Sequence, residues 1–330
     1  MSRPRVGFLG TGWIGRNRMA AILATGLVEP AFICDPDPAC VAEARALAPQ
    51  ALVVEDFDAM LGGRPDGVVI ATPSAQHAAQ SSRALAAGVA VFCQKPLGRS
   101  AAEVREVVEM ARRADRLLAV DLSYRATRAV EAIRALVQSG ELGGIYAADL
   151  TFHNAYGPDK PWFYDRAQSG GGCVIDLGVH LVDLALHVLD FPDVVGVSSH
   201  LFAQGRPLVG DGVEDYATAE LTLATGAVVR LACSWRLHAG RDAVIEAVFR
   251  GADGAAALGN VDGSFYDFAV DRLDGTAARR IVAPPDDWGG RAAARWAQAL
   301  SRANRFDPEA ERYGAVAGIL DRIYQSRAAY

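Results

Sequence analysis

The chain has 330 residues and a formal net charge of −6, and 51% of its residues are hydrophobic while 22% are charged. It is long enough for two hydrophobic cores and too apolar to be disordered, and its negative charge argues against a nucleic-acid partner. The five cysteines are scattered and show no C-x-x-C spacing, which argues against a disulfide framework and a zinc site. We find neither a membrane-length apolar run nor a signal-peptide core, and we therefore expect a cytoplasmic protein without a membrane partner.

Short β-branched runs alternate with longer Ala-rich amphipathic stretches from residue 4 to about residue 120. The apolar runs predict buried strands at Arg5–Leu9, Pro30–Cys34, Gly67–Ala71, Ala90–Cys93 and Leu117–Val120. The stretches between them predict helices at Trp13–Thr25, Pro38–Ala48, Gln76–Ala87 and Ala101–Ala114. This alternation indicates a doubly wound parallel sheet with helices on both faces.

The pattern changes after about residue 122. Helices are expected at Ala126–Ser139 and Val174–Leu189, and the apolar and polar residues of 218–223 alternate before a turn at 224–226, which predicts an antiparallel hairpin with 227–235. We therefore expect an α/β fold with two domains, 1–122 and 123–330, the second being α+β with a mostly antiparallel open sheet. Whether its C-terminal helices pack back on the first domain is left open.

A glycine-rich turn follows the first strand and opens the first helix, with the sequence Gly10-Thr11-Gly12-Trp13-Ile14-Gly15. The first glycine allows a tight turn, the second allows close approach to a pyrophosphate, and the third allows helix and strand to pack closely. Asp35, at the end of the second strand, can bind the ribose hydroxyls and repel a 2′-phosphate. The sequence therefore predicts a Rossmann dinucleotide-binding domain that prefers NAD, with NADP possible and a purely structural glycine turn as the alternative.

Lys95, in the segment Cys93-Gln94-Lys95-Pro96-Leu97, follows another predicted strand. Ligands bind outside the carboxyl ends of parallel strands, so this amine is expected near the reacting end of the cofactor. The chain has only one other lysine, Lys160, and relies on arginine for its remaining positive charge. Because lysine can exchange a proton and arginine cannot, Lys95 is a candidate acid/base, the alternative being an ordinary surface lysine.

Asp176 and His180 lie four residues apart after the glycine run 170–172, and we expect them on one face of a helix. Such a pair can orient a substrate hydroxyl and pass its proton. Asp183 and His187 repeat the spacing and are the competing pair, for which surface ion pairing is the alternative. A structural role stays open for Asp176 and His180. No third ligand is in view, so we expect no metal.

Together these motifs resemble the Gfo/Idh/MocA family over almost the whole chain. The resemblance also includes the stretch 71–77 and the sequence Ser139-Gly140-Glu141-Leu142-Gly143. It implies NAD- or NADP-dependent oxidation or reduction of a sugar, polyol, cyclitol or related hydroxyl compound by a homo-oligomer, either a dimer or a tetramer. It implies Lys95 as acid/base, Asp176 as orienting carboxylate and His180 as proton-transfer partner, and it adds to the cofactor site Thr72, Pro73, His77 and Gln94.

Two residues depart from the family pattern. The usual Glu-Lys-Pro reads Gln94-Lys95-Pro96, which removes a negative charge beside the lysine and, by our hypothesis, makes the amine easier to deprotonate. Ser74 stands where asparagine is frequent, which is a milder change.

Aromatic and polar residues around the glycine run are further candidates for the substrate pocket, because sugars bind through apolar faces and a few fixed polar groups. They are Tyr124, Asn154, Trp162, Tyr164 and Arg166. Packing alone is the alternative for the aromatic residues. Two other functions also stay open: an NAD-dependent glycosidase-type enzyme that uses transient oxidation, and a non-catalytic NAD-binding regulatory protein.

Overall fold

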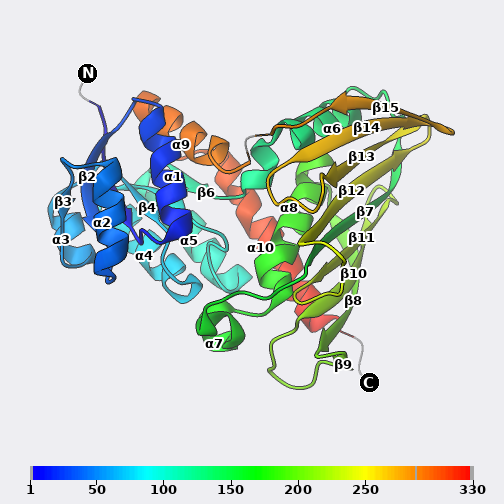
Figure 1. The fold of residues 1–330 in the computed structure, drawn as a ribbon, viewed down its shortest axis with the longest axis horizontal. Helices are drawn as coiled ribbons and strands as arrows, with labels where there is room; N and C mark the ends of the chain where they lie inside the picture. Colours follow the sequence, from blue (N-terminus) through cyan, green and yellow to red (C-terminus); the bar gives the residue numbers. More distant parts are fainter. Residues whose placement is uncertain (1–2, 287, 328–330) are drawn as a thin grey trace. The chain divides into compact units, whose positions relative to one another are not determined.

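A six-stranded, wholly parallel sheet forms the centre of the first of two units in the computed structural model, which describes residues 3–286 and 288–327 (Figure 1). The strands lie in the order β3-β2-β1-β4-β5-β6. Their bounds are β1 Arg5–Leu9, β2 Glu29–Cys34, β3 Leu52–Val53, β4 Gly67–Ile70, β5 Ala90–Cys93 and β6 Leu118–Val120. The predicted doubly wound sheet is confirmed, and the two-residue strand β3 is an addition to it.

The helices of this unit start and end on local signals. They are α1 Trp13–Ala24, α2 Pro38–Leu47, α3 Phe57–Gly62, α4 Ser74–Ala86, α5 Ala101–Ala114 and, from late in the chain, α9 Arg291–Arg302, followed by the short helix η4 Pro308–Glu311. The side chain of Asp37 caps α2 by accepting from the Ala39 amide, and Ser100 does the same for α5 at Glu103. Gly26 and Gly88 take left-handed backbone conformations just after α1 and α4.

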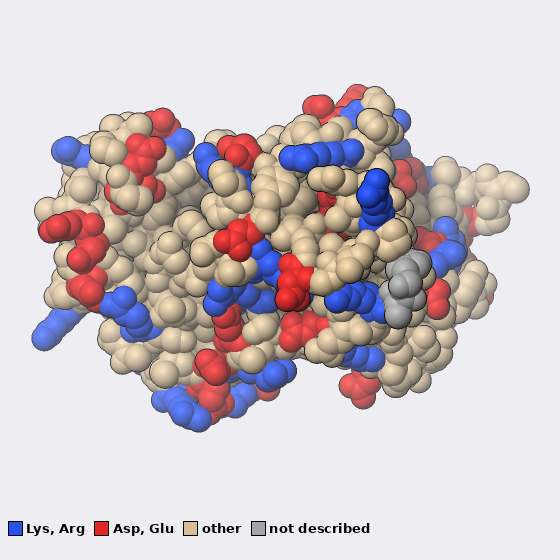
Figure 2. Space-filling model, turned by 90° about the horizontal axis from the view of Figure 1, so that it is seen from below, with Lys and Arg blue, Asp and Glu red and all other residues tan. Residues whose placement is uncertain are grey.

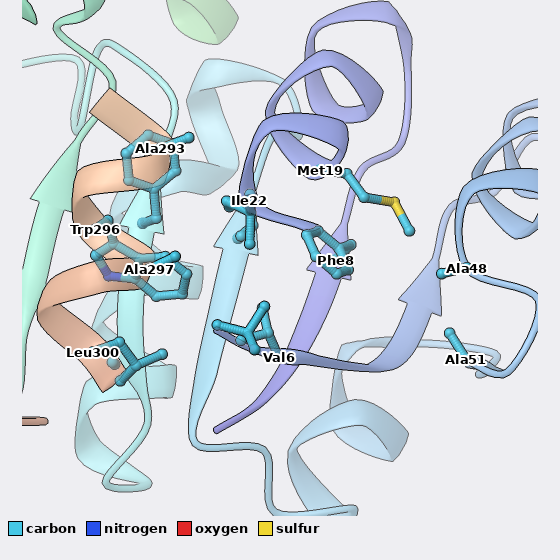
Figure 3. Close-up of a cluster of buried hydrophobic side chains, with 14 of the residues drawn as sticks. Val6, Phe8, Met19, Ile22, Ala48, Ala51, Ala293, Trp296, Ala297 and Leu300 are labelled. Atoms are coloured by element: carbon cyan, nitrogen blue, oxygen red, sulfur yellow. The ribbon is translucent and has the colours of Figure 1, made fainter. Parts of the chain in front are cut away.

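The core of the first unit includes a helix that is distant in sequence. Figure 3 shows Trp296 and Leu300 of α9 beside Val6 of β1 and Ile22 of α1, and all four are at most 4% exposed. The Trp296 ring also lies 5.8 Å from that of Phe92. The first unit thus consists of the chain up to Ser123 together with Gly289–Gly314.

The second unit, Tyr124–Trp288 with the chain from Ala315 onward, is built on a nine-stranded sheet in the order β15-β14-β13-β12-β7-β11-β10-β8-β9. Its bounds are β7 Ile145–Asn154, β8 Val194–Ala203, β9 Arg206–Pro207, β10 Tyr216–Leu223, β11 Val228–Ser234, β12 Ala243–Gly251, β13 Gly254–Asn260, β14 Phe268–Asp274 and β15 Ala277–Val282. Among the strand pairs of the described residues in this sheet, only β7–β11 is parallel. The predicted mostly antiparallel sheet and its hairpin, β10 with β11, are confirmed.

Helices cover one face of this sheet (Figure 1). They are α6 Arg128–Gln138, α8 Val179–Val188 and α10 Arg312–Gln325, with the short turns η1 Ser123–Ala126, η2 Pro161–Tyr164, α7 Arg166–Ser169 and η3 Val174–Gly178. Strand β10 alternates accordingly, because its alanines and leucines are buried while Thr218 and Glu220 are not. On the face of the molecule drawn in Figure 2, acidic and basic side chains are interspersed and do not gather in a patch of one sign.

The helical segment Arg166–Val188 has 23 residues and is long and apolar enough, by length and composition, to cross a membrane. The expectation that no run in the chain reaches that length is therefore wrong. However, 89% of its most apolar window is buried inside the protein, where α8 packs against β7 and β11. The apolar residues of the segment are those of a core helix.

Candidate active site

The candidate residues fall into two sets, one carried by each unit. In the first unit, the glycine-rich turn has the geometry that its sequence predicts. Gly10 has φ +81°, and a Cβ there would lie 2.6 Å from the Ala71 carbonyl, while a Cβ at Gly15 would lie 2.2 Å from the Gly10 oxygen. A Cβ at Gly12 would meet no described atom within 4 Å. Two glycines are thus required by packing, and the third leaves open space.

The open space at Gly12 lies at the start of α1, where no side chain among the described residues caps the helix. Amide groups at such a helix start favour an anion, so the turn fits the pyrophosphate of a dinucleotide. Trp13 is 59% exposed and Ile14 is partly buried at the same helix start. These residues are the ones that would hold the cofactor's phosphates.

Asp35 is fixed beside this turn. Its Oδ2 accepts from the Thr11 amide at 2.5 Å and its Oδ1 accepts from the Asp37 amide at 2.9 Å. Arg16 donates to the Thr11 carbonyl at 2.6 Å and pairs with Glu43 at 2.5 Å. A carboxylate therefore lies beside the glycine-rich turn, and the nearby guanidinium is already paired.

The turns after β4 and β5 are joined by His77 of α4. Its Nε2 lies 2.6 Å from the Thr72 carbonyl oxygen, and its Nδ1 lies 2.7 Å from that of Pro96. The ring is 1% exposed, and burial lowers the pKa of His77, with the charge of Lys95 acting in the same direction. His77 therefore holds the Thr72-Pro73 turn and the Lys95-Pro96 turn together.

Lys95 is partly buried and follows Gln94 at the carboxyl end of β5. The Gln94 side chain donates to Asp121 Oδ2 at 2.5 Å, and the same oxygen accepts from Arg18 Nε at 2.5 Å. The sequence did not single out Arg18 or Asp121, because neither belongs to a recognisable motif. Both are among the most buried charged residues of the unit.

In the second unit, Asp176 lies in a π-helical turn, Val174–Gly178, that precedes α8, where a regular helix was expected. Such turns are frequent at functional sites. Asp176 Oδ2 accepts from Trp235 Nε1 at 3.0 Å. Trp235 is 3% exposed, stands directly after β11 and lies edge-on to Tyr164, with ring centroids 5.6 Å apart. Trp235 thus fixes the carboxylate, and no local sequence pattern indicated it.

His180 lies in the first turn of α8 and is 6% exposed. The Tyr124 ring lies edge-on to it at 4.8 Å, and Phe152 lies at 6.2 Å. Tyr124 also contacts Phe268 and Trp288, with ring centroids 5.7 and 5.8 Å away. His180 is therefore held by an aromatic cluster in which Tyr124 is central.

The remaining substrate candidates differ in their surroundings. Within the described residues, Asn154 Oδ1 is buried without a hydrogen-bond partner at the end of β7. Trp162 stacks on Phe163, and the Tyr164 hydroxyl accepts from Arg236 at 3.1 Å. The Arg166 guanidinium lies over the Tyr324 ring at 4.9 Å.

Asp183, the competing acid, is paired within the core and not at the surface. It is 1% exposed, and Arg125 Nε lies 2.7 Å from each of its carboxylate oxygens. Burial raises the pKa of Asp183, and the charge of Arg125 opposes that shift. Asp183 thus joins α8 to the turn η1.

Comparisons with known proteins give the same family for both parts of the chain. A model described as "Oxidoreductase family, NAD-binding Rossmann fold" matches residues 4–122, and the "GFO/IDH/MocA C-terminal domain" matches residues 130–257. The chain is 29% identical to D-glucoside 3-dehydrogenase of Escherichia coli (strain K12) over 77% of its length and 76% of the relative. It is 30% identical to dTDP-3,4-didehydro-2,6-dideoxy-alpha-D-glucose 3-reductase of Streptomyces violaceoruber over 91% of this chain and 86% of the relative. The structure of levoglucosan dehydrogenase in complex with NADH and L-sorbose shares the fold, with a TM-score of 0.84 and 21% identity over 99% of this chain and 97% of that one.

Proposed function

We propose that this chain, an NAD(P)-dependent oxidoreductase that belongs to the Gfo/Idh/MocA family, oxidises or reduces one carbon of a sugar or a related polyol. The names of the relatives, a D-glucoside 3-dehydrogenase and a sugar-nucleotide 3-reductase, support a sugar substrate. A cyclitol is a second candidate within the same chemistry. A bound nicotinamide would supply the hydride acceptor or donor.

The residues have separate roles in this proposal. Lys95 gives or takes the proton of the substrate hydroxyl, and His180 is its partner in proton transfer. Asp176 accepts a hydrogen bond from a substrate hydroxyl. The observation that carries the proposal is the contact of Trp235 Nε1 with Asp176 Oδ2, because a buried donor that fixes a carboxylate sets its orientation before substrate arrives.

The cofactor preference that we propose is NAD over NADP. Asp35 supports it, because its carboxylate lies beside the glycine-rich turn and would repel a 2′-phosphate on a dinucleotide bound there. The pairing of Arg16 with Glu43 supports it further, since that guanidinium already has an acidic partner.

We also propose that the enzyme is a cytoplasmic homo-oligomer, a dimer or a tetramer. The face of the nine-stranded sheet that bears Thr218 and Glu220 supports this. It holds a polar hollow of about 530 Å³ that is lined from β7, β8, β10 and β11 and includes Asp149, His200 and Arg230. Light scattering on the purified protein would give the number of subunits.

A screen of cofactor reduction tests the function. The purified chain is incubated with NAD⁺ or NADP⁺ and a panel of aldoses, glycosides, sugar acids and cyclitols, and absorbance at the reduced-nicotinamide band is followed. We expect net NAD⁺ reduction with at least one sugar. Product release from a glycoside without net reduction would indicate the glycosidase-type reaction instead. Tight NAD binding with no turnover across the panel would indicate a regulatory protein.

A further inference from the structure

Three polar side chains are buried together at the carboxyl end of the parallel sheet. Arg18 is 1% exposed, Asp121 is 2% exposed and Gln94 is 8% exposed. They come from α1, from the residue after β6 and from the residue after β5. Asp121 Oδ2 receives both the Arg18 Nε–H and the Gln94 amide.

The charges of this trio sum to zero, with one carboxylate, one guanidinium and one neutral amide. A buried charge is tolerated only when it is paired and hydrogen-bonded, and Arg18 supplies the pairing for Asp121. The third position must donate a hydrogen bond and add no charge, which glutamine does. A carboxylate at position 94 would instead face Asp121 at hydrogen-bond distance.

The trio also fixes the start of the Lys95 turn. The main-chain amide of Gln94 donates to the Ile70 carbonyl at 2.8 Å, and that of Asp121 donates to the Cys93 carbonyl at 2.8 Å. Gln94 is thus held through its main chain and through its side chain. The next residue along the chain is Lys95.

We propose that Asp121 carries the fixed negative charge of this part of the site and that Gln94, held by Asp121, is a positioning residue for Lys95. The inference rests on the proposed acid/base role of Lys95. The trio needs one carboxylate to pair with Arg18 and one neutral amide, and positions 94 and 121 supply one each. The acid and the amide should therefore be exchangeable between the two positions.

The experiment compares four proteins with the wild type: Gln94→Glu, Gln94→Met, Asp121→Asn and the exchange variant Gln94→Glu/Asp121→Asn. Thermal midpoints and, with an active sugar, kcat and KM are measured between pH 5.5 and 8.5. Gln94→Met is the matched control, because it removes the hydrogen bond and leaves Arg18 paired with Asp121. Lys95→Ala serves as the reference for loss of the acid/base.

The pH dependence of Gln94→Glu has a defined sign. Two carboxyl groups at hydrogen-bond distance cannot both ionise easily, so the pair retains a proton and the last ionisation moves to higher pH. The variant is therefore most stable at low pH and loses stability as the pH rises. Neighbouring ionisable groups include Arg18, Lys95, His77, whose pKa burial lowers, and Cys93, whose pKa is raised to about 12 chiefly by burial, with Asp121 contributing.

We expect kcat to fall roughly tenfold or more in Gln94→Glu, with KM little changed and the deficit growing with pH. Gln94→Met shows a smaller loss that is independent of pH. The exchange variant again holds one carboxylate and one neutral amide beside Arg18, so two acids no longer repel each other. Its kcat therefore recovers to within about threefold of the wild type.

Two results would overturn the inference: a wild-type pH profile in Gln94→Glu, or an exchange variant no better than the sum of its single changes. If the wild type is active and Lys95→Ala is inactive, either of these results overturns the inference about Gln94 and leaves the proposed function intact. If Lys95→Ala keeps full activity, the proposed function fails first. The thermal midpoints then still decide whether the acid and the amide exchange between positions 121 and 94.

Discussion

In the first unit, the candidate residues stand on short turns at the ends of parallel strands, whereas in the second unit they stand on and beside a helix buried among aromatic rings. Backbone groups and charges fix the first set, as His77 and Asp121 show. Ring packing and one indole N–H fix the second set. Under the proposed roles, changes in the first unit alter proton transfer by Lys95 and cofactor choice, while changes in the second alter proton transfer by His180 and the orientation of the substrate.

The largest effect is expected from Lys95→Ala. Loss of a general acid/base lowers kcat by about 10²- to 10⁴-fold, while binding of NAD⁺, measured by calorimetry, stays near the wild-type value. Lys160→Ala is the matched control, because Lys160 is the only other lysine and is exposed beside Asp159. Near-full turnover in Lys95→Ala would remove the first unit's catalytic role.

Trp235→Phe tests the second unit. The change removes the donor to Asp176 and keeps an aromatic ring, and a hydrogen bond to a charged group is worth about 2 kcal/mol, or roughly 30-fold in kcat/KM. Asp176→Asn in the same background should cost less than it does alone, because Trp235 acts through Asp176, which also binds the substrate hydroxyl. Fully additive effects in this double-mutant cycle would show that Trp235 acts independently of Asp176.

Asp35→Ser should change the cofactor preference and leave sugar binding unaffected. Removing the carboxylate beside the glycine-rich turn eliminates the repulsion of a 2′-phosphate, so the ratio of kcat/KM for NADP⁺ to that for NAD⁺ rises by about tenfold. Asp37→Ser, at the neighbouring helix cap, is the control and should leave the ratio near that of the wild type. An unchanged ratio in Asp35→Ser would place the determinant of the preference elsewhere.

The smallest effect is a pH dependence of stability in the first unit. Because burial lowers the pKa of His77 in the folded state, the unfolded chain takes up the proton first as the pH falls below the ordinary value of 6.5. The stabilisation is therefore present above that pH and decreases toward acid. The thermal midpoint of the wild type should fall more between pH 7.5 and 5.5 than that of His77→Gln, and equal falls would contradict this.

Local patterns predicted the parallel sheet, the glycine turn and the hairpin β10–β11, because each depends on residues close in sequence. Trp235 and Asp121 could not be found in the same way. Each acts through a contact made across the fold, with 59 residues separating Trp235 from Asp176 and 103 separating Arg18 from Asp121. Asp183 shows the same limit, because its repeat of the i, i+4 spacing gave no sign of Arg125 as a buried partner.

The return of α9 to the first unit has a consequence for the order in which the protein can fold. Trp296 and Leu300 complete a core whose other members include Val6 and Ile22, which lie far earlier in the chain. On the ribosome the parallel sheet has to wait until the nine-stranded sheet and α9 have been made before its last apolar surface is covered. A gene fragment that stops after β6 would encode all six strands and still leave that surface in water.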